Sequence, residues 1–79
     1  MATFQLSIVG PDRAVADETV ASAVLPGREG YIGIMAGHVP LIAALKPGVL
    51  EYNDPAGLRH HVYIGGGFAE VRDNRVIVL

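Results

Sequence analysis

The sequence predicts an all-β fold, a flattened sandwich of two sheets with about eight to ten short, mostly antiparallel strands. Two observations lead to this prediction. Ten glycines and five prolines interrupt the 79 residues at short intervals, and the segments between them are rich in Val and Ile. No linker, internal repeat or low-complexity segment divides the chain, so residues 1–79 are expected to form one domain.

The N-terminal segment shows the strand pattern most clearly. Phe4, Leu6 and Ile8 alternate with polar residues, a period of two that places one face of a strand on the core and the other in solvent. Pro11 is expected to end this strand, because proline has no N–H to donate to a neighbouring strand.

Residues 15–25 are mostly small and β-branched. Their alanines leave a helix open on propensity alone, but the alternation within residues 20–24 favours extended structure. We expect two short strands here, with a bend near Asp17-Glu18 and a stop at Pro26-Gly27.

The central part of the chain is rich in glycine. A loop is expected from Gly27 to Gly37, with a short apolar piece at residues 31–34. Pro40 then forces the residue before it into an extended conformation, and the extended segment that follows is predicted to end at a turn, Lys46-Pro47-Gly48.

The next two strands are expected at Val49–Tyr52 and His60–Ile64, joined by a hairpin connection at residues 53–57. The run Gly65-Gly66-Gly67 then breaks the second strand. A bulge or a turn with positive φ would explain the run, and close approach by a partner chain is the functional alternative.

The C-terminal segment is predicted to form a tight hairpin. Strands at residues 68–72 and 75–79 flank Asp73-Asn74, whose side chains tolerate the left-handed backbone that such a turn requires.

The composition excludes several classes of function. The absence of cysteine excludes disulfides and thiolate metal sites. A net charge of −2, with Lys and Arg scattered along the chain, argues against binding of nucleic acid. No apolar run approaches the ~20 residues that span a bilayer, and the N-terminus lacks the features of a signal peptide. With 51% hydrophobic residues and a mean hydropathy of +0.37, part of the apolar surface is expected to face a partner.

No pattern of catalytic or metal-binding residues stands out. His60 and His61 are adjacent on a predicted strand and point to opposite faces, so they cannot bind one ion together. The glycines of residues 27–37 lack the order of a phosphate-binding loop, and no serine lies in a nucleophile motif. Most carboxylates are assigned to turns, where they would cap backbone groups: Asp12, Asp17, Glu18, Asp54 and Asp73. The sequence therefore predicts no catalytic residue, no metal site and no cofactor.

Several motifs, in order along the chain, resemble the epsilon subunit of F-type ATP synthases. Residues 26–48 read PGREGYIGIMAGHVPLIAALKPG, which is similar to that family's glycine-rich loop followed by G-I, G-H-x-P-L and K-P-G. Residues 66–71 are similar to its G-G-F-x-E-V motif, and residues 76–79 to its V-x-V-L strand. Residues 4–11 resemble the family's first strand and turn. The match covers nearly the whole chain, and the collinear order of the motifs makes it specific.

This resemblance implies a non-catalytic β-sandwich domain at the foot of the central stalk. It implies binding to the gamma subunit and to the polar loops of the membrane ring, which helps to couple ion flow to ATP synthesis. It also implies a place on the cytoplasmic face of the energy-transducing membrane, without direct insertion into the bilayer. The family commonly continues into two C-terminal helices that in some members inhibit ATP hydrolysis or bind ATP. The resemblance ends with the sandwich at Leu79, as in a short form or a truncated chain, so those roles are not transferred.

The resemblance also suggests which residues meet each partner. The glycine-rich loop is the expected contact with the membrane ring, through Arg28, Glu29, Gly30 and Tyr31. Tyrosine offers an apolar body with a polar tip, and the two charges would steer and orient more than they bind. The expected gamma contacts come from the next segment: His38, Pro40, Leu41 and Ala43. For His38 the alternative is a turn residue whose ring bonds to the backbone.

A function from another class is open on the residues alone. A small-ligand-binding β-sandwich or barrel would use the glycine-rich loop as the mouth of a pocket. Such a site would place polar residues at inward positions of the strands, and the alternation shows few of them.

Overall fold

The computed structural model describes residues 2–79, which contain seven strands and no helix. The all-β class is thereby confirmed, whereas the number of strands is lower than predicted. The strands are β1 (Phe4–Val9), β2 (Ala14–Val20), β3 (Ser22–Gly27), β4 (Gly30–Met35), β5 (Leu41–Asn53), β6 (Arg59–Arg72) and β7 (Arg75–Val78).

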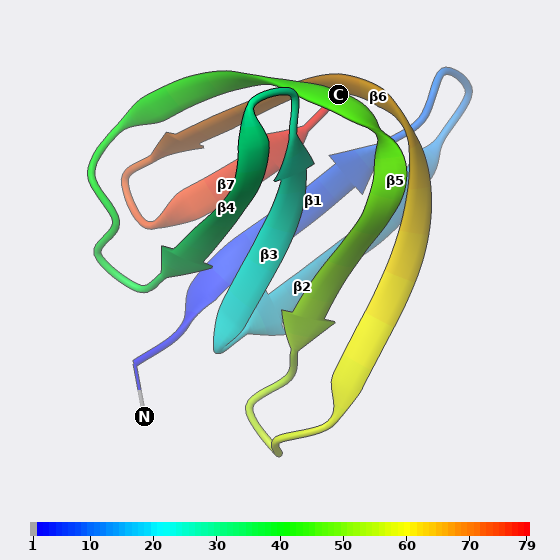
Figure 1. The fold of residues 1–79 in the computed structure, drawn as a ribbon. Coiled ribbons are helices and arrows are strands. Elements are labelled where there is room, and N and C mark those ends of the chain that lie inside the picture. Colours follow the sequence, from blue (N-terminus) through cyan, green and yellow to red (C-terminus); the bar gives the residue numbers. More distant parts are fainter. Residues whose placement is uncertain (1) are drawn as a thin grey trace.

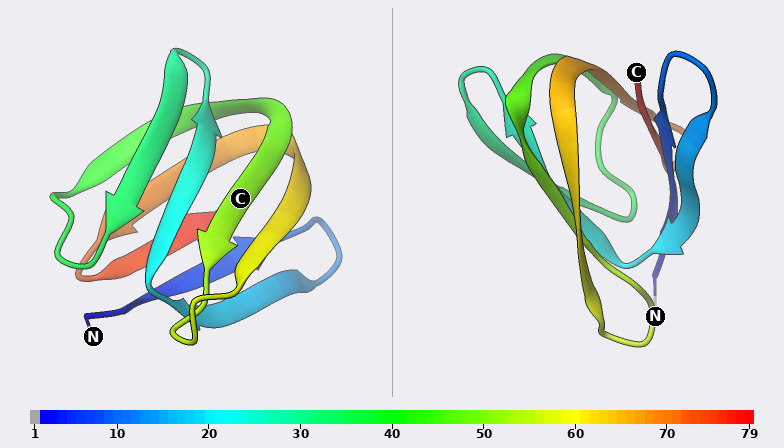
Figure 2. Two further views of the ribbon diagram at one scale, coloured as in Figure 1. Left: turned by 60° about the horizontal axis from the view of Figure 1, so that its bottom comes forward. Right: turned by 90° about the vertical axis from the view of Figure 1, so that its right-hand side faces the viewer.

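The strands join edge to edge in one hydrogen-bonded sheet, in the order β2-β1-β7-β6-β5-β3-β4. Neighbours are antiparallel except β1 and β7, which are parallel. The sheet folds over on itself into two layers (Figures 1 and 2). Layer 1 contains β1, β2, β7 and the adjoining halves of β5 and β6, and layer 2 contains β3, β4 and the remaining halves.

The two long strands connect the layers. β5 and β6 keep one register from Leu41↔Val71 to Asn53↔Arg59, in which only Lys46 and Gly66 are not paired. Where they pass from layer 1 to layer 2 both strands bend together, at residues 46–48 of β5 and 65–67 of β6, a region we call the corner. Buried positions on β5 change phase there, from Leu45 before the corner to Leu50 after it.

The corner corrects two of the predicted breaks. Lys46-Pro47-Gly48 is not a turn and Gly65-Gly66-Gly67 does not end a strand, since both lie inside continuous strands. Gly66 and Gly67 have φ values of 100° and 118°, which side chains disfavour. A Cβ on Gly67 would also stand 3.0 Å from the carbonyl carbon of Leu79. The glycine run therefore serves a bend and the close approach of the chain's own backbone.

The predicted bend near Asp17-Glu18 is also wrong, because both residues lie inside β2 and the chain turns after Val20. The Asp17 carboxylate caps no turn: it accepts hydrogen bonds from the side chains of Gln5 at 2.7 Å and Ser7 at 3.0 Å. These two residues lie on the neighbouring strand β1. The polar character of Asp17 thus reflects hydrogen bonds between two neighbouring strands and not a turn.

The predicted hairpin at Asp73-Asn74 is confirmed, since both residues have positive φ, 50° and 59°. The Asn74 side chain also reaches outside its own turn. Its amide group donates to the carbonyl of Thr3 at 2.8 Å, and its oxygen accepts from the N–H of Gly37 at 2.9 Å. This turn thereby fixes the N-terminal segment and the loop before β5.

The core lies between the layers and is apolar throughout. Among residues 2–79 no polar or charged residue is buried, as expected where two alternating faces meet. The predicted inward residues of β1 are confirmed. The buried hydrophobic residues of this core are Phe4, Leu6, Ile8, Val20, Ala23, Leu25, Ile34, Leu45, Leu50, Tyr52, Ile64, Ala69, Val71, Val76 and Val78.

Candidate protein-interaction surfaces

The glycine-rich loop of the sequence is the hairpin of β3 and β4, with Arg28 and Glu29 at its turn. Pro26 and Gly27 do not stop β3, because they pair with Tyr31 and Gly30 across the hairpin. We call residues 28–31 the hairpin tip. Its four residues, all predicted to contact a partner, are exposed.

The hairpin tip is attached to the start of β5. The backbone N–H of Arg28 donates to the carbonyl of Ala44 at 3.0 Å. Within the hairpin, Gly27 permits close packing of the two strands, because a Cβ there would lie 2.8 Å from Cδ1 of Ile32. The tip is therefore held by the sheet and is not a free loop.

The side chain of Tyr31 is the largest group at the tip and is 72% exposed. The ammonium nitrogen of Lys46, at the corner, lies 5.7 Å from the centre of its ring, within the range of a cation–π contact. The contact links the hairpin tip to the corner of the sandwich.

The four residues expected to contact gamma, His38, Pro40, Leu41 and Ala43, differ in exposure. Pro40 is exposed, and His38 is half-buried, with the Nδ1–H of its ring donating to the carbonyl of Val39 at 2.7 Å. This bond fits the alternative reading of His38 as a turn residue. Leu41 and Ala43 are half-buried, whereas Ile42 between them is 74% exposed.

A groove brings members of both predicted sets together. Its walls are the hairpin tip and the start of β5, and Leu41 and Ala43 line it opposite residues 28–31. His38 and Pro40 do not line this groove; Pro40 borders a neighbouring hollow with Ile42 and Glu70.

Sequence reasoning missed an exposed apolar patch that shares Ile42 and Ala44 with the lining of the groove. Phe68, 60% exposed, pairs across the strands with Ala44, and Ile42 is the next outward residue of β5. We call these three residues the Ile42–Phe68 patch. They lie on the outer face of layer 1, because the alternate residues Leu45 and Ala69 are buried. The alternation along β5 and β6, started from buried Leu45 and Ala69, would have identified these residues as outward-facing.

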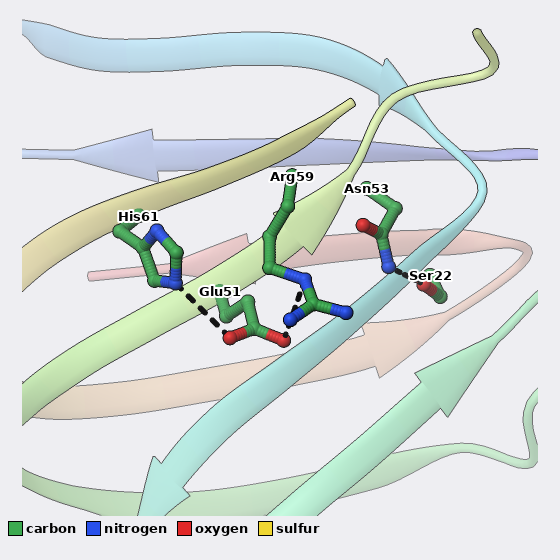
Figure 3. Close-up of polar contacts among 5 residues, drawn as sticks. All are labelled: Ser22, Glu51, Asn53, Arg59 and His61. Atoms are coloured by element: carbon green, nitrogen blue, oxygen red, sulfur yellow. Dashed lines mark hydrogen bonds and ion pairs between the residues drawn. The ribbon is translucent and has the colours of Figure 1, made fainter. Parts of the chain in front are cut away.

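The outer face of layer 2 carries a row of polar contacts (Figure 3). The Glu51 carboxylate lies 3.1 Å from Nε2 of His61 and 3.6 Å from Nε of Arg59. Asn53 donates to the hydroxyl of Ser22 at 2.9 Å. Exposed ion pairs of this kind contribute about 0–1 kcal/mol each, so the row stabilises the face only slightly.

Large apolar side chains surround that polar row. Met35, Val49 and Tyr63 are exposed on the same outer face as Tyr31. We call these four residues the layer 2 face. The molecule thus exposes apolar groups on both outer faces, as the high hydrophobic content suggested.

Asp54 and His60 form a hydrogen-bonded pair at the far end of layer 2. The His60 imidazole donates to Asp54 at 2.9 Å and stacks on the Tyr52 ring. This hydrogen bond, followed by that from the N–H of Leu58, lowers the pKa of Asp54. Burial of the Tyr52 phenol is the main cause that raises its pKa.

The described residues assemble no metal site. Within residues 2–79 no three His, Cys, Asp or Glu side chains are placed to hold an ion. His60 and His61 bond to different carboxylates, Asp54 and Glu51. In the same range the structure contains no helix long and apolar enough to cross a membrane.

The alternative of a small-ligand module receives little geometric support. An apolar groove opens between the layers beside the end of β7, lined by residues such as Ile8, Val62 and Leu79. Ligand pockets usually add a few convergent polar side chains, and the walls of this groove contain only apolar side chains apart from the hydroxyl-bearing ring of Tyr63.

Comparison with known proteins is consistent along the whole chain. Residues 3–79 match the family described as ATP synthase, Delta/Epsilon chain, beta-sandwich domain. The ATP synthase epsilon chain of Desulfatibacillum aliphaticivorans is 45% identical over 74 residues, 94% of this chain and 52% of the relative. That of Syntrophomonas wolfei is 46% identical over 77 residues, 98% of this chain and 56% of the relative. The chain thus spans about half the length of these relatives.

Solved structures agree with this match. A chain of the Euglena gracilis mitochondrial ATP synthase, in an assembly of OSCP, F1 and c-ring, superimposes with a TM-score of 0.91 at 32% identity. The superposition covers 99% of this chain and 50% of that one. A chain of the Tetrahymena thermophila central stalk and c-ring has the same fold, with a TM-score of 0.74 at 16% identity over 94% of this chain and 60% of that one. The chain belongs to the family of ATP synthase delta/epsilon β-sandwich domains.

Proposed function

We propose that this chain is the sandwich domain of a central-stalk, or rotor, subunit of a proton- or sodium-driven F-type ATP synthase. It binds the gamma subunit and the polar loops of the membrane ring, and so helps to couple ion flow to ATP synthesis. The domain catalyses no reaction, needs no cofactor and lies at the cytoplasmic face of the energy-transducing membrane as a peripheral part. The observation that carries the proposal is the family match over residues 3–79.

The architecture suits a part that transmits torque. One continuous sheet closes over an apolar core, and protein interiors packed in this way deform little under load. β5 and β6 connect the two layers without a flexible link. A force applied to one layer is therefore passed to the other through hydrogen-bonded strands.

Two surfaces supply the contacts that this function needs. We assign the hairpin tip, Arg28 to Tyr31, to the membrane ring. We assign the start of β5, with His38, Pro40, Leu41 and Ala43, to the gamma subunit, and add the Ile42–Phe68 patch to it. Large exposed apolar side chains such as Ile42 and Phe68 are the kind of group that anchors protein interfaces.

The proposal is tested by binding the purified chain to purified gamma subunit and, separately, to the isolated membrane ring. We expect both to bind. Replacement of Tyr31 by serine should weaken binding to the ring and leave binding to gamma unchanged. A folded chain that binds neither partner would contradict the proposal, and equal loss of both contacts on Tyr31→Ser would contradict the assignment of the tip.

A further inference from the structure

The hairpin tip and the adjoining corner carry an excess of positive charge in an acidic molecule. Arg28 and Lys46 are exposed there, and Glu29 is the one carboxylate between β3 and β4. In residues 2–79 the ion pairs involve other residues, so neither cation is neutralised by the chain itself. These three residues sum to +1, and because the whole chain has a net charge of −2, the remainder carries −3.

The Lys46 ammonium group has a defined position over the Tyr31 ring. The backbone that carries Arg28 is fixed by its hydrogen bond to Ala44 of β5. Charges attached to fixed backbone lose less freedom on binding than charges on mobile loops. The tip therefore presents one cation held against an aromatic ring and a second cation on an anchored backbone.

The opposite end of layer 2 is acidic. The register places Gly27 next to Leu45 and Ser22 next to Asn53, so the β5–β6 loop lies at the other end of β3 from the tip (Figure 1). A hollow there is lined by Asp54 of layer 2 and by Asp17 and Glu18 of the facing strand β2, with His60 as the single basic group. The resulting charge separation orients the tip toward a negatively charged partner during encounter.

The groove beside the tip defines the rest of the complementary shape. Arg28, Glu29 and Ile32 line its hairpin side and residues 41–44 line its β5 side, so the groove lies at the border between the surfaces assigned to the ring and to gamma. A partner loop that inserts a small apolar side chain on the hairpin side of the groove would bring its neighbouring residue against Arg28. A carboxylate there could accept two hydrogen bonds from the Arg28 guanidinium group.

We infer that the hairpin tip recognises an acidic protein loop, in which a carboxylate binds Arg28 and Lys46 beside an apolar residue seated in the groove. This inference rests on the proposed function, since it specifies the chemistry of the membrane-ring loop that docks here. A membrane surface fits less well, because electrostatic attachment to anionic lipid uses clusters of roughly 4–8 basic residues. The tip offers two, together with Glu29.

The test measures affinity for the isolated membrane ring at low and moderate salt. Arg28→Gln and Lys46→Gln should each weaken binding about two- to fivefold, and the double variant should also lose most of the salt dependence. Arg13→Gln, which removes an exposed cation from the turn before β2, should leave affinity unchanged. Glu29→Gln supplies a test of sign: it should strengthen binding, because it removes a like charge facing an acidic loop.

Modification of the partner provides an independent measurement. Amidation of the exposed ring carboxylates with glycinamide, after activation by a water-soluble carbodiimide that leaves as its urea, should weaken wild-type binding and leave binding of the double variant unchanged. Weaker binding of Glu29→Gln, or wild-type affinity in the double variant, would overturn the inference. So would charge-dependent binding to anionic phosphatidylglycerol vesicles without such binding to the ring. A folded wild-type chain that fails to bind the ring at any salt would instead contradict the proposed function.

Discussion

Two glycine-rich segments of this chain look alike in sequence and serve different purposes in the structure. Residues 27–37 contain the tip and the second strand of a surface hairpin, in which Gly27 lets the tip pack on its own turn. Residues 65–67 lie inside β6 and let the sheet fold over the core. The spacing of glycines in the sequence indicates where the backbone makes close contacts or takes unusual conformations. Whether such a glycine shapes the surface or the core depends on which residues lie across the neighbouring strand.

The largest effect is expected from Gly67→Ala. Its positive φ and the nearby Leu79 backbone should together cost about 3 kcal/mol or more in free energy of unfolding, measured by urea denaturation. Gly65→Ala is the matched control, because nothing lies within 4 Å of its Cβ position; it should change stability by less than about 1 kcal/mol. Similar values for the two variants would disprove the account of the corner.

A smaller effect is expected from Gly27→Ala in the hairpin. Its Cβ would meet the carbonyl oxygen of Gly30 and the side chain of Ile32, but the hairpin end can shift and the isoleucine can rotate. We expect a loss of about 1–3 kcal/mol in the same denaturation experiment. Gly33→Ala on the same hairpin meets open space and should be nearly neutral. A Gly27→Ala variant less stable than Gly67→Ala would reverse the order that the comparison predicts.

The comparison extends to two exposed aromatic residues on either side of the corner. Phe68 belongs to the Ile42–Phe68 patch on layer 1, and Tyr63 to the layer 2 face; they are 60% and 72% exposed. Phe68→Ala should weaken binding to the gamma subunit by about 2 kcal/mol, as for a typical interface anchor. Tyr63→Ala should leave that affinity within about twofold. Titration calorimetry measures the affinity of each variant for gamma. A larger loss of affinity for Tyr63→Ala than for Phe68→Ala would place the gamma contact on layer 2.

The smallest effect concerns the end of layer 2 far from both glycine segments. The hydrogen bond from His60 lowers the pKa of Asp54 in the folded state. The stability it contributes is therefore present above the unfolded pKa, near 3.8, and is lost as the pH falls through the lower folded value. Asp54→Asn should lower the thermal midpoint at pH 7 and converge with the wild type in strong acid. An unchanged midpoint at neutral pH would show that the pair contributes nothing.

Most of the fold could be predicted from the sequence, because alternation is a local signal. The buried residues of β1 and the hairpin at Asp73-Asn74 follow from periodicity and turn chemistry. The corner could not be predicted in this way. Pro47 and the run Gly65 to Gly67 are typical strand breakers, and only their pairing across β5 and β6 shows that the sheet bends there without ending.

The interaction surfaces were predicted less completely. The hairpin tip follows from its glycines, but which side of β5 faces solvent depends on the phase of the alternation. Leu41 and Ala43 lie on the half-buried side, and Ile42 is the exposed residue between them. Phe68 was missed for the same reason, because its exposure is evident only once Ala69 is known to be buried.

Hydroxyl-radical footprinting of the chain in complex with gamma and with the membrane ring tests the central claim most directly, because aromatic and sulfur-containing side chains react readily. Within residues 2–79, four such side chains are exposed: Tyr31, Met35, Tyr63 and Phe68. We predict that gamma protects Phe68, that the ring protects Tyr31, and that Met35 and Tyr63 stay reactive in both complexes. Protection of Met35 and Tyr63 by gamma, with Phe68 unprotected, would contradict the assignment of the gamma contact to the outer face of layer 1.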